Sequence, residues 1–83
     1  MKLLYFAWVR ERTGKAEEEI DLPLALNTVA DVIAWLKEKD ETYDYAFGDL
    51  RVIRAAIDQT MVSLDASIKG AREIAFFPPV TGG

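Results

Sequence analysis

The sequence predicts an α+β fold, a mixed sheet with one main helix lying across one of its faces. Short runs of aromatic and aliphatic residues, typical of strands, lie near both ends of the chain, and a strong helical stripe lies between them. No repeat, linker or low-complexity run interrupts the 83 residues. A single domain is expected over residues 1–77, followed by an extended tail over residues 78–83.

Two strands are expected before the helix. Residues 3–9 carry aromatic and aliphatic side chains at both odd and even positions, which is typical of a central strand covered on both faces. Residues 10–16 are polar and include Gly14, which suits the positive φ of a hairpin loop. The acidic residues 17–22 then form a second strand, which ends at Pro23 because proline has no N–H to donate to a ladder.

The main helix is expected to begin after Thr28. Thr28 as N-cap and Asp31 three residues later resemble a capping box, with Asp in place of Glu or Gln. Lys37 and Lys39 suit the negative end of the helix dipole, and Trp35 lies off the apolar stripe, where it is expected to shield the edge of the core. The stripe, spaced for one helix face, consists of Val29, Val32, Ile33 and Leu36.

The second half of the chain predicts short elements joined by turns. They are a short helix or irregular turn over residues 41–48, strands over 51–57, 61–64 and 73–77, and turns at 58–60 and around Gly70. Two strands, a helix and two or three further strands is the order of a β-grasp roll. In that roll the first and last strands are expected to be parallel central neighbours.

A single helix covers one face of such a sheet and leaves the other face open. By parity, the first strand places Leu3, Tyr5, Ala7 and Val9 on one face and Leu4, Phe6 and Trp8 on the other. The open face is either covered by long side chains and residues 43–47, or it binds a partner protein. The second interpretation is favoured, because a monomer of this size does not normally expose so large an apolar patch.

Composition excludes several kinds of chemistry. The chain has no Cys and no His, so it offers no thiolate nucleophile, no disulfide and no imidazole or thiolate metal ligand. No nucleophile–base pair and no phosphate-binding glycine loop is present, which disfavours a stand-alone enzyme. Asp40, Glu41 and Asp44 form either a cation site or, as we favour, an acidic solvated turn.

Charge and hydropathy limit the partners. The net charge of −4 and the pI near 4.7 argue against nucleic acid, which needs a basic footprint. The longest apolar run, residues 3–9, is far shorter than a membrane span and lacks the features of a signal peptide. A cytoplasmic location is therefore the default expectation.

The last residues are unusual for the end of a strand. Pro78 and Pro79 remove two ladder donors and stiffen the exit from the sheet, and Gly82 and Gly83 have no side chains. The tail is either a frayed terminus or a slim reactive end that passes through a channel too narrow for a Cβ. Because the chain lacks Cys and His, the α-carboxylate is the one group left that we expect to take part in covalent chemistry.

Residues 76–83, Phe-Phe-Pro-Pro-Val-Thr-Gly-Gly, resemble the C-terminus of the molybdopterin synthase small subunit family (molybdopterin-converting factor subunit 1), ubiquitin-like sulfur carriers. Residues 4–11, the helix start at Thr28 and residues 55–64 also resemble this family, so the resemblance covers nearly the whole chain. The chain departs from the family at Asp58, where Asn is common, and in the turn over residues 70–73.

The resemblance implies a mechanism at the end of the tail. An enzyme of the ubiquitin-activating type would use ATP and magnesium to adenylate the Gly83 carboxylate, and a sulfur donor would convert it to a thiocarboxylate. The sulfur would then pass to cyclic pyranopterin monophosphate, forming the dithiolene of molybdopterin. The tail expected to insert into the large synthase subunit, which would carry the catalytic residues, consists of Pro78, Pro79, Val80, Thr81, Gly82 and Gly83. No cofactor is expected to bind the chain tightly.

The resemblance also implies partner surfaces. Phe6, Met61 and Phe77 are the candidates for contact with the large subunit and the activating enzyme, in a heterotetramer of two small and two large subunits. Arg10 either adds a charged contact at the rim or is simply solvated. The alternatives are a related sulfur carrier for thiamine synthesis, a ubiquitin-like protein modifier, and a β-grasp interaction module without terminal chemistry. The diproline behind two phenylalanines favours the molybdopterin carrier.

Overall fold

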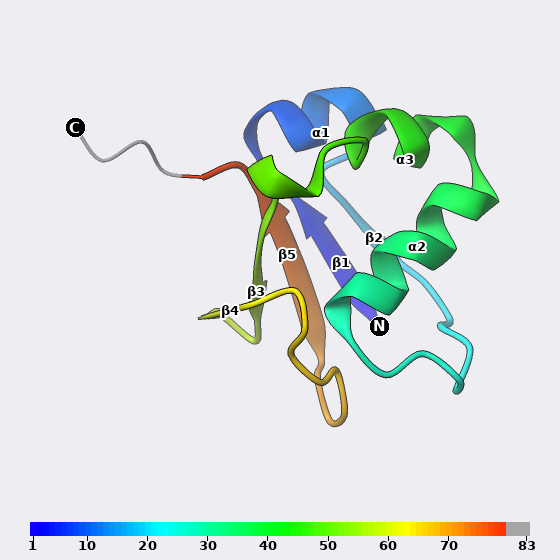
Figure 1. The fold of residues 1–83 in the computed structure, drawn as a ribbon, viewed down its shortest axis with the longest axis vertical. Coiled ribbons are helices and arrows are strands. Elements are labelled where there is room, and N and C mark those ends of the chain that lie inside the picture. The colour runs from blue at the N-terminus through cyan, green and yellow to red at the C-terminus, as the bar shows by residue number, and fades with distance from the viewer. Residues whose placement is uncertain (80–83) are drawn as a thin grey trace.

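A computed structural model describes residues 1–79 and gives a five-stranded mixed sheet with its helices gathered on one side (Figure 1). The elements in chain order are β1 (Lys2–Tyr5), α1 (Ala7–Thr13), β2 (Glu17–Glu19), α2 (Val29–Lys39), α3 (Glu41–Ala46), the 3₁₀ helix η1 (Leu50–Val52), β3 (Arg54–Ile57), β4 (Thr60–Val62) and β5 (Glu73–Phe77). The strand order is β2-β1-β5-β3-β4. Strands β1 and β5 are parallel neighbours in the middle, as the predicted β-grasp roll requires.

The first expected strand is wrong beyond Tyr5. Phe6 is the N-cap of a helix, and Ala7 adopts a φ of 51°, which turns the chain out of the sheet. Helix α1 then buries Val9 and Thr13, which lie one turn apart on the same face. Gly14 does have the expected positive φ, but as the left-handed C-cap of α1 rather than in a hairpin loop.

Helix α2 confirms the pattern expected of it. The Thr28 side chain accepts a hydrogen bond from the Asp31 backbone N–H, and the Asp31 carboxylate accepts one from the Thr28 N–H, so the capping box is complete. The Asp31 carboxylate accepts two backbone hydrogen bonds, from Asn27 and Thr28, and these lower its pKa. Trp35 packs at the edge of the core as expected, and the fully buried stripe consists of Val29, Val32, Ile33 and Leu36.

The second half differs from expectation mainly at its boundaries. Residues 41–48 begin as α3, and the strand expected to start at residue 51 starts at Arg54, because residues 50–52 form η1. Strand β5 spans the predicted residues. The tight turn expected at 58–60 is present at Asp58 and Gln59, which both have a positive φ, and Thr60 already belongs to β4.

The core lies between the sheet and the helices. Its centre is an aromatic cluster in which the rings of Tyr5 and Phe76 stack at 6.0 Å and Phe47 meets Phe76 edge-on at 5.1 Å. Tyr43 and Phe47 belong to this buried cluster. Residues 43–47 therefore pack on the helix side and do not cover the opposite face of the sheet.

Two further features of the described part concern membranes and metals. Within residues 1–79, no helix is long and apolar enough to cross a membrane. The same residues contain no group of three or more acidic side chains placed to hold a metal ion. In the acidic turn, Asp40 caps α3 by accepting a hydrogen bond from the Thr42 N–H, which lowers the pKa of Asp40.

Candidate functional site: the open sheet face and the exit of the tail

The strand register places an apolar row on the face of the sheet that the helices leave open. Leu4 lies beside Ala75, Ala75 beside Ala56, and Ala56 beside Met61, so the row crosses β1, β5, β3 and β4. Neighbours paired in this way project to the same side of a sheet. The alternate residues of β1 and β5, Leu3 and Ile74, are fully buried on the core side.

A second row lies at the end of the sheet where β5 stops. Phe77 is paired with Arg54 of β3. On the other side of β5, the Phe6 N–H donates to the Phe76 carbonyl at 3.0 Å, which continues the ladder past β1. The register therefore places Phe6 and Phe77 at the same end of the open face, with Arg54 at its margin.

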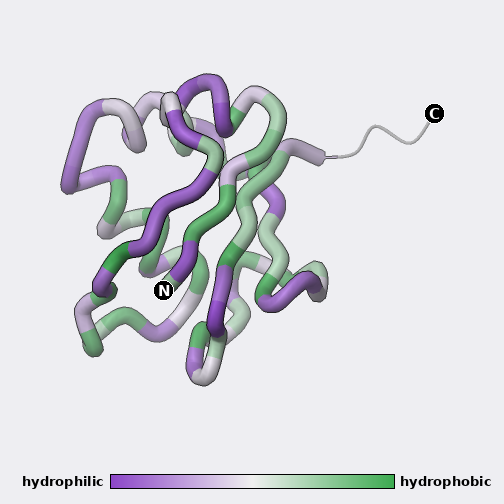
Figure 2. Tube along the Cα trace, turned by 180° about the vertical axis from the view of Figure 1, so that it is seen from behind, coloured by the Kyte–Doolittle hydropathy of each residue, from purple (hydrophilic) through white to green (hydrophobic). Residues whose placement is uncertain are grey.

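The large side chains on this face are unusually accessible. Phe6 is 49% exposed and Met61 is 60% exposed, whereas Phe77 is half-buried. Seen from behind, the uncovered central strands are largely hydrophobic, and the edge strand β2 is hydrophilic (Figure 2). The predicted interface residues Phe6, Met61 and Phe77 thus share one open face, while Trp8, expected there by parity, lies in α1 and packs at the edge of the core.

The acidic edge of the open face is largely neutralised within the chain. Glu17 and Glu19 of β2 lie beside Leu4 and Lys2. The Lys2 ammonium lies 3.3 Å from the Glu17 carboxylate, and the N-terminal ammonium lies 3.6 Å from that of Glu19. The charges at this edge are exposed pairs, which contribute little to stability.

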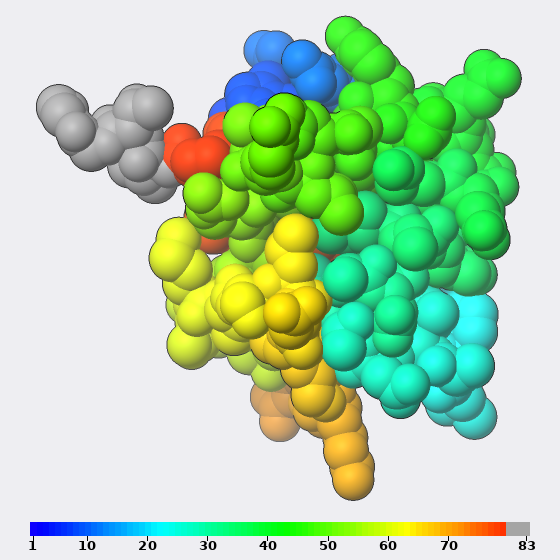
Figure 3. All heavy atoms as spheres, in the orientation of Figure 1, coloured from blue at the N-terminus to red at the C-terminus, as the bar shows by residue number. Residues whose placement is uncertain are grey.

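The chain leaves the sheet at the prolines. Pro78 and Pro79 follow β5 without secondary structure and are half-exposed. The last described residues reach the molecular surface between α1 and η1 (Figures 1 and 3). Val80, Thr81, Gly82 and Gly83, on which the predicted chemistry depends, lie outside the described residues.

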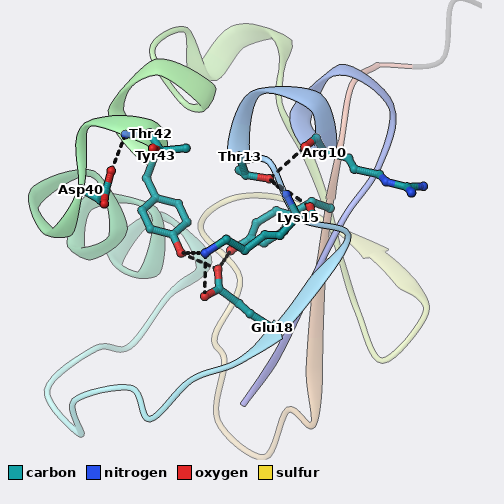
Figure 4. Close-up of polar contacts among 8 residues, drawn as sticks. Arg10, Thr13, Lys15, Glu18, Asp40, Thr42 and Tyr43 are labelled. Carbon is teal, nitrogen blue, oxygen red and sulfur yellow. Dashed lines mark hydrogen bonds and ion pairs between the residues drawn. The ribbon is translucent and has the colours of Figure 1, made fainter.

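Arg10 lies on α1, the helix that packs beside the end of β5. It is exposed, and its side chain points away from the neighbouring cluster of polar side chains (Figure 4). Nearby on the same helix, the Arg12 guanidinium lies over the Trp8 ring at 4.4 Å and over the Tyr45 ring at 4.9 Å. Arg12 therefore links α1 to α3, whereas Arg10 is exposed at the surface.

A polar network on the core side fixes strand β2 against the helices (Figure 4). The Glu18 carboxylate accepts hydrogen bonds from the hydroxyls of Tyr5 and Tyr43, and the Lys15 ammonium lies 3.5 Å from it. Burial by itself would raise the pKa of Glu18, but the donors from Tyr43, Tyr5 and Lys15 outweigh it and lower that pKa. Burial and the Glu18 carboxylate raise the pKa of both tyrosines.

The Asp58 side chain joins the turn between β3 and β4 to the rest of the sheet. The Asp58 carboxylate accepts hydrogen bonds from the backbone N–H groups of Arg72 and Glu73, both at 2.9 Å. These bonds tie the turn to the start of β5. Asp is also among the few residues that adopt a positive φ without a large penalty.

Sequence reasoning missed Ala56 and Arg54 as members of this surface. Parity predicts Leu4 on the same face as Phe6, and its pairing with Ala75 confirms that prediction. Arg54 was placed inside a longer strand whose start was wrong. Its pairing with Phe77 depends on where η1 ends and β3 begins.

These features define a class first: a ubiquitin-like β-grasp protein with an open apolar face beside its C-terminal exit. The chain belongs to the ThiS family, whose profile matches residues 3–83. It is 38% identical to the molybdopterin synthase sulfur carrier subunit of Escherichia coli (strain K12), over 100% of this chain and 99% of that protein.

Two solved structures agree with the fold. A putative molybdopterin converting factor, subunit 1, from Pyrococcus furiosus superimposes with a TM-score of 0.71 and 32% identity, covering 95% of each chain. The small archaeal modifier protein 1 of Haloferax volcanii superimposes with a TM-score of 0.73 and 26% identity, covering 100% of this chain and 98% of the other. The family resemblance seen in the sequence is thereby confirmed.

Proposed function

We propose that the chain is the sulfur carrier subunit of a molybdopterin synthase. The observation that carries the proposal is the combination of the family-like tail, residues 76–83, with an open apolar face at the sheet end from which that tail departs. The relatives named as sulfur carrier subunits of this synthase support it. A small stable body with one docking face and a slim end suits a carrier.

The proposed chemistry takes place at the Gly83 carboxylate. A carboxylate oxygen attacks the α-phosphorus of ATP-Mg in an activating enzyme of the ubiquitin-activating type, and pyrophosphate leaves. Sulfide then attacks the acyl carbon, AMP leaves, and the tail ends in a thiocarboxylate. The thiocarboxylate sulfur then forms a bond to a carbon of cyclic pyranopterin monophosphate on the large subunit, which supplies the catalytic residues. Water hydrolyses the bond between this sulfur and the Gly83 acyl carbon, so that the Gly83 carboxylate is regenerated, and a second loaded chain supplies the second sulfur of the dithiolene.

The open face is the proposed docking surface for the large subunit. Phe6 and Phe77 lie next to the exit of the tail, so a partner that covers them also receives the residues from Pro78 to Gly83. We extend the proposal to a heterotetramer of two small and two large subunits and to a cytoplasmic location. We also propose that Arg10, which is exposed on α1, adds a charged contact at the rim of this surface.

Deletion of Gly83 tests the proposal. The shortened protein is expected to keep its unfolding midpoint, because the residue lies beyond the last strand, and to lose formation of molybdopterin when mixed with sulfur-loading enzymes and the large subunit. Lys69→Gln, an exposed change in the turn at the other end of the sheet, is the matched control and is expected to stay active. Retained activity after the deletion would exclude a carrier role for the terminus.

A modifier function is the second candidate, because the archaeal modifier protein shares this fold at 26% identity. In that case the Gly83 carboxylate would form an isopeptide bond with a lysine amine of a target protein. An immunoblot of cells that express the tagged chain distinguishes the two: a ladder of higher-mass conjugates supports the modifier, and a single band supports the carrier.

A further inference from the structure

Arg54 stands out among the cations near the open face. It is the first residue of β3, it is paired with Phe77 at the end of β5, and its side chain is exposed. The residue that follows Phe77 is Pro78, so Arg54 lies beside the root of the tail. No carboxylate of residues 1–79 forms an ion pair with Arg54, although the chain as a whole carries a net charge of −4.

The Arg54 guanidinium is held in place by its own backbone. The Nη1 atom donates to the Arg51 carbonyl at 3.1 Å and to the Ile53 carbonyl at 3.0 Å. No further hydrogen bond from the Arg54 side chain is formed within residues 1–79. The Nε and Nη2 hydrogens, which together form the edge that grips a carboxylate in two parallel hydrogen bonds, are therefore free of partners in this part of the chain.

In Arg51, three residues earlier, the corresponding Nε/Nη2 edge of the guanidinium is bound to a carboxylate of the same chain. Its Nε and Nη2 atoms each donate to the Asp49 carboxylate at 3.0 Å. Arg51 is thus satisfied within the chain, whereas Arg54 has a fixed orientation and an open edge. The two arginines lie on adjoining elements, η1 and β3, and differ mainly in this respect.

We propose that Arg54 is a specificity residue of the docking surface, and that the large subunit presents an Asp or Glu carboxylate to its Nε/Nη2 edge. This inference rests on the proposed function. A partner that covers Phe77 also removes water from the neighbouring guanidinium, and an unpaired charge is costly to bury at an interface. Because two backbone carbonyls already orient the Arg54 guanidinium, forming two parallel hydrogen bonds to a carboxylate costs less conformational entropy.

Paired arginine variants test the inference. The affinity of the full-length chain for the large subunit encoded in the same genome is measured by calorimetry for the wild type, Arg54→Gln and Arg51→Gln. We expect Arg54→Gln to raise Kd about tenfold at low salt and Arg51→Gln to change it less than about twofold. Arg54→Lys is expected to fall between, because an ammonium keeps the charge but not the fork.

Salt and stability separate this role from a structural one. The effect of Arg54→Gln on Kd is expected to shrink as salt is raised, while the unfolding midpoint stays unchanged because the side chain is exposed. Arg54→Glu is expected to weaken binding further. Changing the Asp or Glu of the large subunit that contacts Arg54 to Lys is then expected to restore the affinity of this variant.

Each contrary result has a definite meaning. If wild type binds and Arg54→Gln binds equally well, or if both arginine variants weaken binding to the same extent, the inference is wrong and the proposed function stands. If the wild-type chain does not bind the large subunit at all, the proposed function fails.

Discussion

At the scale of single residues, Glu18 shows how one carboxylate can organise a small protein. Its carboxylate projects from β2 toward the core side. There it accepts hydrogen bonds from the hydroxyls of a tyrosine in β1 and a tyrosine in α3, and it forms an ion pair with the ammonium of Lys15 in the loop after α1. Its neighbour Glu17 projects to the open face, and its one ion pair within residues 1–79 is with the exposed Lys2. Because successive residues of a strand project to opposite faces, Glu18 has a structural role while the adjacent Glu17 is solvated.

Glu18→Gln is expected to lower the free energy of unfolding by about 1–2 kcal/mol at pH 7, because hydrogen bonds to a charged acceptor become neutral ones. The pKa of Glu18 is lowered in the folded protein, so its stabilising contribution is present above the unfolded pKa and lost as pH falls through the folded one. The gap between wild type and variant in urea melts should therefore narrow below about pH 4.

Glu17→Gln is the control for this measurement and should change stability by less than about 0.5 kcal/mol. A gap for Glu18→Gln that stays constant from neutral to acid pH would show that the charge of Glu18 does not stabilise the fold.

At the scale of elements, prediction succeeded where the signal is local. Helix α2 was predictable because Thr28 and Asp31 form a capping box before a clear stripe, and β5 because prolines end it. Helix α1 was not, because an apolar run such as residues 3–9 fits a strand or a helix equally well. The strand ends because Ala7 has a positive φ. Alanine rarely adopts that conformation, so the sequence does not indicate a break there.

The two faces of the sheet should respond differently to mutation. Ile33→Ala, in the fully buried stripe of α2, is expected to lower the free energy of unfolding by about 2–5 kcal/mol with little change in affinity of the folded fraction. Phe77→Asp is expected to weaken binding to the large subunit by about 2 kcal/mol or more and to destabilise less, since the new carboxylate faces Arg54.

Thermal unfolding and calorimetric titration of both variants check this pair. Severe unfolding by Phe77→Asp with unchanged affinity of the folded fraction would contradict the assignment of Phe77 to the docking surface. A near-neutral melt for Ile33→Ala would contradict its place in the core.

At the scale of the whole molecule, the β-grasp order and the central parallel pair were predictable from the sequence of elements alone. The composition of the open face was only partly predictable. Parity identified Leu4, Phe6, Met61 and Phe77, but Arg54 and Ala56 needed the register between β3 and β5. The absence of Cys and His, which excludes most side-chain chemistry, fits a protein whose proposed reactive atom is on its main chain.

Intact-protein mass spectrometry tests this proposed role most directly. The chain is incubated with ATP-Mg, a ubiquitin-activating-type enzyme and a sulfide source, with the Gly83 deletion as control. We expect the wild-type mass to rise by the difference between one sulfur and one oxygen, with the change located at Gly83, and the mass of the deletion variant to stay constant. An unchanged wild-type mass, under conditions that load the Escherichia coli carrier subunit, would contradict the proposal.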